Sequence, residues 1–300
     1  MLPRDREMAE NLNQREPLFP HFERFVKASG LDRAKGSLSA KLPRILGQGT
    51  TRAAGMSDPP ADIERKAELA GLQFPADVIV PEEVQAEVQA ASTDVEALRT
   101  ELKRPDGLRR FVTRSLQDLA GTKGSSNGYY FVDRLILRDS KSGFEWAWCV
   151  TPHYPIVDKI PPDPSYVAKA FSIAQEQIRA IVLPADEFES RLSLAWTMAR
   201  HFSRSDDVLV TDVMRMYQIA GQSDKFWQMP KRVFYKDFPE AAFVVNLLYW
   251  RSQPKSSDAG FTFVPATLSQ ASGKAARVFF MPLNPEGTEV RPMVYLRRTV

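Results

Sequence analysis

The segment from Lys225 to Lys236 interleaves cationic and aromatic residues along one short stretch of the chain. Proteins that bind nucleic acid use this mixture, because Lys and Arg neutralise phosphates while ring faces stack on bases. The residues predicted to form such a surface are Lys225, Trp227, Lys231, Arg232, Tyr235 and Lys236. The alternative is a structural loop whose charges face water and whose buried anchors are Phe226, Trp227 and Phe234.

A second group of cations lies on a predicted helix, Leu108–Leu119. Its apolar residues fall on one side and Arg109, Arg110 and Arg114 on the other, which is typical of an amphipathic surface helix. We expect these three arginines to assist the binding surface around Lys225 to Lys236.

Nucleophilic catalysis would need a pair such as Cys149 and His153, which lie four residues apart at the end of a predicted strand. A thiolate beside an imidazole is the reactive pair of cysteine hydrolases. In an extended strand, however, residues with this spacing are about 13 Å apart. The sequence therefore favours a small buried Cys149, and no catalytic residue is assigned.

Carboxylates at Asp133, Asp139 and Glu145 flank the first predicted hairpin, where a metal-dependent nuclease could gather them. The second strand continues Glu145-Trp146-Ala147, without the lysine that such a cluster usually contains. The alternative is that these charges cap strands and face solvent. One cysteine and three histidines also fall short of the ligands for structural zinc. We therefore predict no metal ion and no cofactor.

A helix-turn-helix could lie within Arg191–Gly221, with Thr211–Ala220 entering the major groove and presenting Arg215 and Gln218. The connector Ser203–Val210 is too long for that motif's turn of three or four residues. A winged-helix variant with the C-terminal hairpin as its wing would tolerate this length. The alternative is plain helix packing through Val213, Met214 and Tyr217.

Apolar periodicity predicts the elements that position these residues. Helical patterns cover Phe19–Val26, Asp62–Ala70, Pro81–Lys103, Leu108–Leu119, Tyr166–Leu183, Ala185–Phe202, Thr211–Gly221 and Glu240–Arg251. Strand patterns cover Tyr130–Arg138, Phe144–Thr151, Phe261–Thr267, Arg277–Leu283 and Val290–Arg297. Segment Asp139–Gly143 is a hairpin connector, Ala34–Pro60 is interpreted as linker, and Pro152–Pro164 as irregular. Strands, then helices, then strands indicate an α+β fold with an antiparallel sheet.

Aromatic residues and charges both divide the chain. Of 31 aromatic residues only Phe19, Phe22, Phe25 and Phe74 precede residue 110, so the packed core is expected in the C-terminal two-thirds. Residues 1–55 carry ten Lys/Arg against six Asp/Glu, and residues 56–101 carry three against eleven. We expect a flexible basic arm with a short helix (1–60), an acidic helical segment (61–105) and an α+β core domain of about five helices (106–300).

Two apolar stripes in the N-terminal part could dock a protein partner or a second copy of the chain. One consists of Phe19, Phe22 and Phe25, and the other runs from Val84 to Leu102 on an acidic helix. The longest apolar run, Ala241–Trp250, falls well short of the roughly 20 residues that cross a bilayer. No apolar segment follows the charged N-terminus, so we expect a cytoplasmic protein without a membrane contact.

The sequence therefore favours a non-enzymatic binding protein that contacts nucleic acid or an acidic protein through its basic aromatic surface. The alternative is an assembly subunit that docks through the N-terminal helices. A third hypothesis is a metal-dependent nuclease or other hydrolase with carboxylates near the first hairpin.

Overall fold

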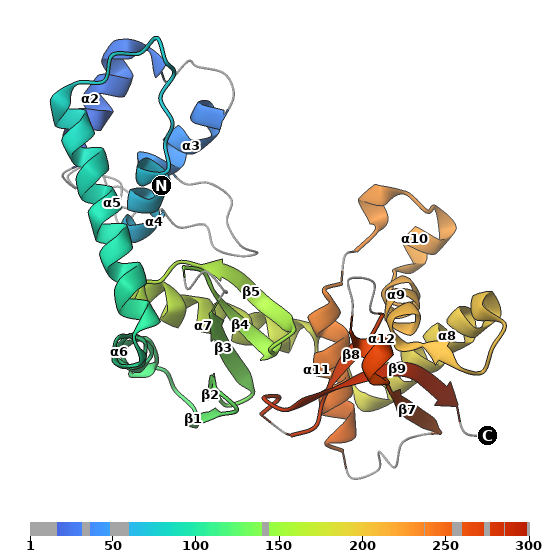
Figure 1. Ribbon diagram of the computed structural model, residues 1–300. Coiled ribbons are helices and arrows are strands. Elements are labelled where there is room, and N and C mark those ends of the chain that lie inside the picture. The colour runs from blue at the N-terminus through green and yellow to red at the C-terminus, as the bar shows by residue number, and fades with distance from the viewer. Residues whose placement is uncertain are drawn as a thin grey trace, which may run out of the picture. The chain divides into compact units, whose positions relative to one another are not determined.

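The computed structural model describes residues 17–31, 37–48, 60–139, 144–236, 238–253, 260–272, 277–284 and 286–298 (Figure 1). The start of the predicted arm, most of the predicted linker and the connector 140–143 lie outside these residues. Unit 1 of the two compact units comprises Met1–Ser115, Lys141–Phe144 and Ile160–Val167. Unit 2 comprises Leu116–Ser140, Glu145–Lys159 and Ala168–Val300. We expected domain boundaries at residues 60 and 105. The two compact units do not follow these boundaries, and the expected boundaries stay a prediction.

Helices make up most of the described part of unit 1: α2 (Pro20–Ser29), α3 (Ser37–Ile45), α4 (Asp62–Ala70), α5 (Glu82–Lys103) and α6 (Pro105–Leu116). Their apolar stripes meet in one cluster, in which Phe22, Ile45 and Leu69 have no exposed surface. Glu87 of α5 accepts the backbone N–H groups of His21 and Phe22 at 2.9 and 2.7 Å. A carboxylate at this place satisfies free donors in the first turn of α2.

The interpretation of Ala34–Pro60 as linker is wrong at residues 37–45, where α3 forms. This helix buries Leu42 and Ile45 in the apolar cluster of unit 1. Pro43 lies inside it, and proline disfavours a helix because it lacks a backbone N–H. Burial of Leu42 and Ile45 therefore outweighs the preference of Pro43 against a helix.

The scarcity of aromatic residues near the N-terminus does not prevent a core there. Phe74 packs edge-on against Phe22 and Phe25, with ring centroids 6.4 and 6.2 Å away. Phe19 is buried in the same cluster. The expectation that core material lies almost entirely after residue 110 is thus wrong, because four phenylalanines and several aliphatic residues suffice for a small core.

Unit 2 contains a sheet whose strands follow chain order: β1 (Lys123–Ser126), β2 (Tyr129–Val132), β3 (Leu135–Asp139), β4 (Trp146–Thr151) and β5 (Tyr154–Ile160). All six residues of β4 are buried. Strands β3 and β4 pair antiparallel, with Leu137 opposite Trp148. The predicted hairpin between these two strands is confirmed.

Two details of this sheet differ from the prediction. The expected single strand Tyr130–Arg138 is wrong, because a turn at Asp133, with φ 53°, splits it into β2 and β3. Aspartate tolerates this left-handed conformation better than most residues. The irregular segment expected from Pro152 to Pro164 contains β5. Pro155 is compatible with β5 because that strand ends the strand order, and an edge strand can spare a donor.

The helices of unit 2 confirm the predicted ones to within two or three residues: α7 (Pro164–Ile181), α8 (Ala185–Ser203), α9 (Val210–Ala220) and α11 (Glu240–Arg251). Eight of the twelve residues of α11 are buried. Phe188 of α8 packs against Tyr217, Phe243 and Trp250 at centroid distances of 5.6 to 6.0 Å. Aromatic residues from three helices thus form the centre of the core.

The C-terminal residues of unit 2 form a second antiparallel sheet: β6 (Val208–Leu209), β7 (Phe261–Pro265), β8 (Phe279–Pro282) and β9 (Val290–Arg298). Its order is β6-β9-β7, and β8 also pairs with β9. The three predicted C-terminal strands are confirmed, and short helix α12 (Leu268–Ala271) lies between two of them. The fold is α+β, as expected. None of the helices in the described ranges is long and apolar enough to cross a membrane.

Candidate functional site

Residues 223–236, called here the basic aromatic loop, leave the body of unit 2 between α9 and α11 (Figure 1). The loop contains a single-turn helix, α10 (Asp224–Gln228), and a 3-10 turn, η2 (Arg232–Phe234). Pro230 separates the two turns. No residue of either turn is buried, so the loop has the opposite environment to the long helices beside it.

A glutamine that follows α9 holds the loop at its base. The Gln222 side chain is 7% exposed, and its Nε2 donates to the carbonyl oxygens of Gln218 and Lys236 at 2.9 and 2.7 Å. Its Oε1 accepts the backbone N–H of Lys236 at 2.7 Å. Gln218 likewise donates to the carbonyl of Phe238 at 2.8 Å. The side-chain amides of Gln218 and Gln222 therefore hold the C-terminal end of the loop, and Phe238 just after it, against the end of α9.

The rings of the loop pack mainly against one another. Phe226 meets Trp227 and Tyr235 edge-to-face, with centroid distances of 5.8 and 5.7 Å. Lys225 places its ammonium 4.5 Å from the centre of the Phe234 ring. Edge-to-face pairs and cation–π contacts each stabilise by about 1 kcal/mol. The loop can thus hold a defined shape without entering the core.

Exposure is the property that sets this loop apart. The exposed fractions of its large apolar residues are 50% for Trp227, 46% for Met229, 78% for Val233 and 37% for Tyr235. Its cations Lys225, Lys231, Arg232 and Lys236 are exposed as well. The structural alternative, in which Phe226, Trp227 and Phe234 are buried anchors, is wrong for Trp227, while the other two are half-buried. Several exposed large apolar residues within one short segment are typical of an interaction site.

Trp227 differs from every other tryptophan of the chain. The remaining four, Trp146, Trp148, Trp196 and Trp250, are all at most 6% exposed. A half-bare indole between cations is an unusual use of the residue with the largest apolar surface. Among the side chains of the candidate site, this ring therefore gives the clearest indication of contact with a ligand or partner.

The second cationic group lies on α6 of unit 1. Arg109, Arg110 and Arg114 are exposed there, opposite the buried Phe111 and Val112. Arg110 donates to Glu101 at 3.2 Å, which offsets part of its charge. Because α6 and the basic aromatic loop belong to different units, each group stands as a separate candidate.

The predicted recognition helix does not have the surface that reading a groove requires. Of the eleven residues of α9, all within the described ranges, only Arg215 is exposed, and it pairs with Asp212 at 3.1 Å. Gln218 is engaged with the Phe238 carbonyl. Groove recognition needs several exposed side chains on one helix. The packing alternative through Val213, Met214 and Tyr217 is confirmed, since these residues are buried.

Cys149 is a buried structural residue, as the strand spacing predicts. It has no exposed surface, and burial raises the pKa of its thiol to about 12. His153 is exposed and stacks on Phe280 with ring centroids 3.6 Å apart. Burial of its ring, with a smaller contribution from Arg138, lowers the pKa of His153. A thiol that stays protonated at neutral pH cannot act as the nucleophile of a hydrolase.

The carboxylates near the first hairpin have structural surroundings. Asp133 accepts the backbone N–H of Thr122 at 2.8 Å and returns its own N–H to the Thr122 carbonyl at 2.8 Å. Asp139 and Glu145 are exposed. Within the part of the chain that the structure describes, no three His, Cys, Asp or Glu side chains lie close enough to hold a metal ion.

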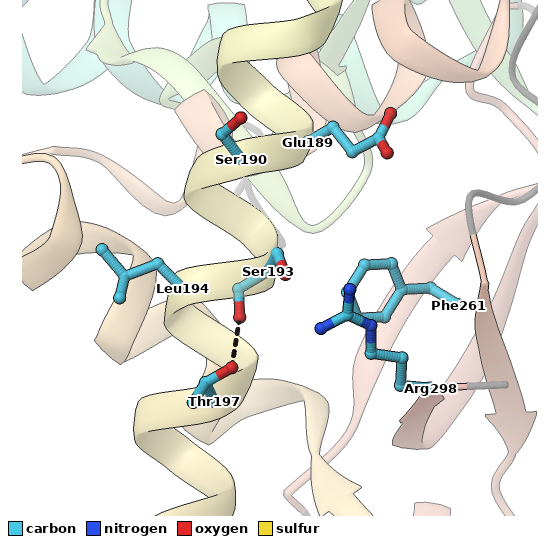
Figure 2. A pocket seen from close by; sticks show the side chains of 7 residues that line it. All are labelled: Glu189, Ser190, Ser193, Leu194, Thr197, Phe261 and Arg298. Atoms are coloured by element: carbon cyan, nitrogen blue, oxygen red, sulfur yellow. Dashed lines mark hydrogen bonds between the residues drawn. The ribbon is translucent and has the colours of Figure 1, made fainter. Parts of the chain in front are cut away.

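An open hollow of about 440 Å³ lies between α8 and the second sheet (Figure 2). Ser190 and Ser193 line it, and Arg298 faces Phe261 with its guanidinium 5.6 Å from the ring centre. Thr197 donates its hydroxyl to the Ser193 carbonyl at 2.9 Å. The described residues that line the hollow include no histidine or lysine, so no base of that kind activates either serine.

The two apolar stripes of the N-terminal part face the interior of unit 1. Phe19 and Phe22 are at most 5% exposed, and Val84, Val95 and Leu102 are buried along α5. Phe19, Phe22 and Val84 pack in the apolar cluster of unit 1, and Val95 and Leu102 are buried as well. They are not a free docking surface, contrary to the expectation from the helical pattern alone.

Comparisons with protein-family models, with curated proteins and with solved structures each gave no match to this chain. The function is therefore inferred from the geometry of the molecule alone. The prediction from sequence identified the cations and rings of the loop, but it pointed to Gln218 only as a groove-reading residue and missed Gln222 as an anchor and the exposure of Met229 and Val233. Two glutamines one helical turn apart at the end of a helix are the only local signal of that anchoring.

Proposed function

We propose that this protein is a non-enzymatic binding protein that contacts single-stranded nucleic acid through the basic aromatic loop. The observation that carries the proposal is the half-exposed Trp227 ring within a loop that also exposes four cations. Unpaired bases stack on aromatic side chains, and nearby cations neutralise the phosphates between them.

The anchoring of the loop supports this function. A stacking platform binds more tightly when its ring is held in place before the ligand arrives, because less conformational entropy is lost on binding. The Gln222 hydrogen bonds fix the base of the loop, and Phe226 packs against Trp227 from within it. A single strand fits better than a duplex, because the base faces of a duplex are covered by stacking.

Salt dependence of binding to a labelled oligothymidylate tests the proposal. If the loop neutralises up to four phosphates, log affinity should fall against log salt with a slope approaching about −3. Fluorescence anisotropy between about 50 and 200 mM salt measures that slope. Binding that ignores salt, or no binding at the lowest salt, contradicts the proposal.

Substitutions in the loop give a second test with matched controls. Lys231→Ala with Arg232→Ala should weaken binding and flatten the salt slope by about 1 to 1.5. Arg204→Ala with Arg291→Ala removes the same charge from exposed positions of unit 2 outside the loop and should have little effect. Trp227→Ala should cost about 1 to 3 kcal/mol of binding free energy through lost stacking. Equal losses in the two double variants would contradict a site at the loop.

An acidic protein segment is the second candidate partner. It is favoured by the exposure of Met229 and Val233, because aliphatic surface contributes to protein interfaces and little to phosphate binding. Under this candidate, Val233→Ser would weaken partner binding while the oligothymidylate would fail to bind the native protein. The oligothymidylate titration therefore separates the two candidates.

A further inference from the structure

A cavity of about 330 Å³ lies directly beneath the basic aromatic loop. Ser223 and Lys236, the two ends of the loop, contribute to its wall. The rest of its lining comes from the end of α7, from Arg191 of α8, from the end of α9, from Phe238 and from α11. Cavities of this volume are at the lower end of the range of small-molecule sites.

The cavity carries positive charge. Arg191 and Lys236 both line it, and their cationic groups lie 5.8 and 5.3 Å from the centre of the Phe238 ring. Arg191 also pairs with Glu187 at 3.0 Å, but that carboxylate is half-exposed and does not line the cavity. A guanidinium has five N–H donors, so this ion pair uses only part of its capacity. The described residues of the lining include no carboxylate.

A buried hydroxyl in the same lining makes no hydrogen bond of good geometry. Tyr217 is 2% exposed, and among the described residues its Oη has only the Arg191 guanidinium as a poorly aligned donor. Burial raises the pKa of this hydroxyl to about 12, although the charge of Arg191 and its contact with the hydroxyl oxygen act in the opposite direction. Tyr217 is therefore protonated at neutral pH and offers an O–H donor. A buried polar group without a partner costs stability, and such groups in native proteins call for an explanation.

Gly221 leaves space that the Arg191 guanidinium occupies. Its φ is −84°, a value that any residue adopts, so the backbone does not require glycine here. A Cβ atom at this position would lie 2.6 Å from Nη1 of Arg191 and 3.2 Å from the Phe238 ring. The absence of a side chain therefore makes room for Arg191 beside the end of α9.

We propose that this cavity binds a small organic anion, a carboxylate or a phosphate monoester, whose anionic oxygen accepts from the Arg191 guanidinium and, once the buried hydroxyl turns towards the cavity, from Tyr217. Lys236 adds charge, and the apolar part of the ligand lies against Ile181, Leu183 and Ala242. Each of the three features, a cationic lining, an unused hydroxyl and a glycine that makes room for Arg191, has a role in such a site.

Four ligands of the same apolar size test this site on the full chain: butyrate, butyl phosphate, butylammonium and butanol. Nitrogen-15 amide shifts of Gly221, Gln222 and Lys236 report on binding, because these residues surround or adjoin the cavity. Butyrate or butyl phosphate should give saturable shifts up to about 20 mM, a range suited to weak small ligands. Butylammonium and butanol should not. The stronger of the two anions identifies the headgroup.

Tyr217→Phe is the decisive variant, because it keeps the ring that packs on Phe188 and Phe243 and removes only the hydroxyl. It should weaken anion binding at least about tenfold, as expected for a lost hydrogen bond to a charged group. The ligand-free variant should melt at nearly the same temperature as the native protein, since the lost hydroxyl makes no hydrogen bond of good geometry. Tyr249→Phe, an exposed tyrosine on α11, is the matched control and should change neither property.

The outcomes separate this site from the nucleic-acid surface of the loop. Trp227→Ala should leave butyrate affinity unchanged, and Tyr217→Phe should leave oligothymidylate affinity unchanged. Butanol binding as tightly as the anions, no saturable shift with either anion, or unaltered anion binding by Tyr217→Phe would each overturn the anion site.

Discussion

Helix α11 and the basic aromatic loop are neighbours in the chain and similarly rich in aromatic residues, yet their side chains have opposite environments. Phe243 and Trp250 of α11 are 2% and 3% exposed, whereas Trp227 and Val233 of the loop are 50% and 78% exposed. Aromatic content alone therefore does not decide burial.

The spacing of charges explains the difference. In α11 the only charged residues, Glu240 and Arg251, stand at the two ends, so the ten residues between them carry no charge, and eight of these ten are buried. In the loop, every aromatic residue has a charged residue within two positions. Burial of an unpaired charge costs several kcal/mol, more than burial of one ring gains. Cations spaced in this way hold the loop at the surface.

The largest expected effect is on stability in α11. Phe243→Ala should lower the free energy of unfolding by about 3 to 5 kcal/mol, because it opens a cavity among Phe188, Tyr217 and Phe279. Trp227→Ala should lower it by less than about 1 kcal/mol, since much of that ring is already in water. Urea denaturation followed by far-ultraviolet circular dichroism measures both. Similar losses in the two variants would break the contrast between core helix and surface loop.

The next largest effect is a loss of stability at alkaline pH, which we expect from the buried thiol of Cys149. Burial raises the pKa of Cys149 from 9.0 to about 12, so the folded state keeps a proton that the unfolded chain releases above pH 9. Stability from this group is complete below pH 9 and is lost as pH rises towards 12, at up to about 1.4 kcal/mol per pH unit. Urea midpoints between pH 9 and 10 should fall in the native protein and in Trp227→Ala. They should fall less steeply in Cys149→Ala.

A smaller effect concerns the anchoring of the loop. Gln222→Ala removes hydrogen bonds to the carbonyls of Gln218 and Lys236 and to the Lys236 amide, and should cost about 1 to 3 kcal/mol. Hydrogen exchange of the Lys236 amide should accelerate well beyond that of the amides in α11. Gln253→Ala, which changes a residue just after α11, is the control. Hydrogen exchange of the Lys236 amide should be the same in this variant as in the native protein. An unaltered Lys236 amide in Gln222→Ala would show that other contacts hold the loop.

The same contrast shows which parts of the structure can be predicted from the sequence. The bounds of α4 and α11 follow directly from local pattern, because an apolar period or run is bounded by residues that end a helix. The α+β class follows from the order of such elements. Helix α3 and strand β5 were not predictable, because Pro43 and Pro155 oppose the local pattern and distant burial overrides it.

The candidate site was predictable only in its composition. Interleaved cations and rings identify the segment, but whether Trp227 is bare depends on contacts that the segment does not encode. Gln222 reaches Lys236, 14 positions along the chain, and Gln218 reaches Phe238, 20 positions along. The cavity beneath the loop also depends on Arg191, which is still more distant in the sequence and lines it together with Tyr217 and Lys236. Local patterns give elements, and the site arises where side chains from separate elements meet.

The smallest expected effect is that of Val233→Ser, which tests whether aliphatic surface of the loop contributes to oligothymidylate binding. Val233 is 78% exposed, so Val233→Ser should change the free energy of unfolding by less than about 0.5 kcal/mol. Its effect on oligothymidylate affinity should be equally small, because an aliphatic side chain neither stacks on a base nor neutralises a phosphate. Trp227→Ala is the matched change within the same loop and should reduce that affinity while also leaving stability nearly unchanged. If Val233→Ser reduced oligothymidylate binding as much as Trp227→Ala, the loop would act through general apolar contact, and base stacking would not be its mode of recognition.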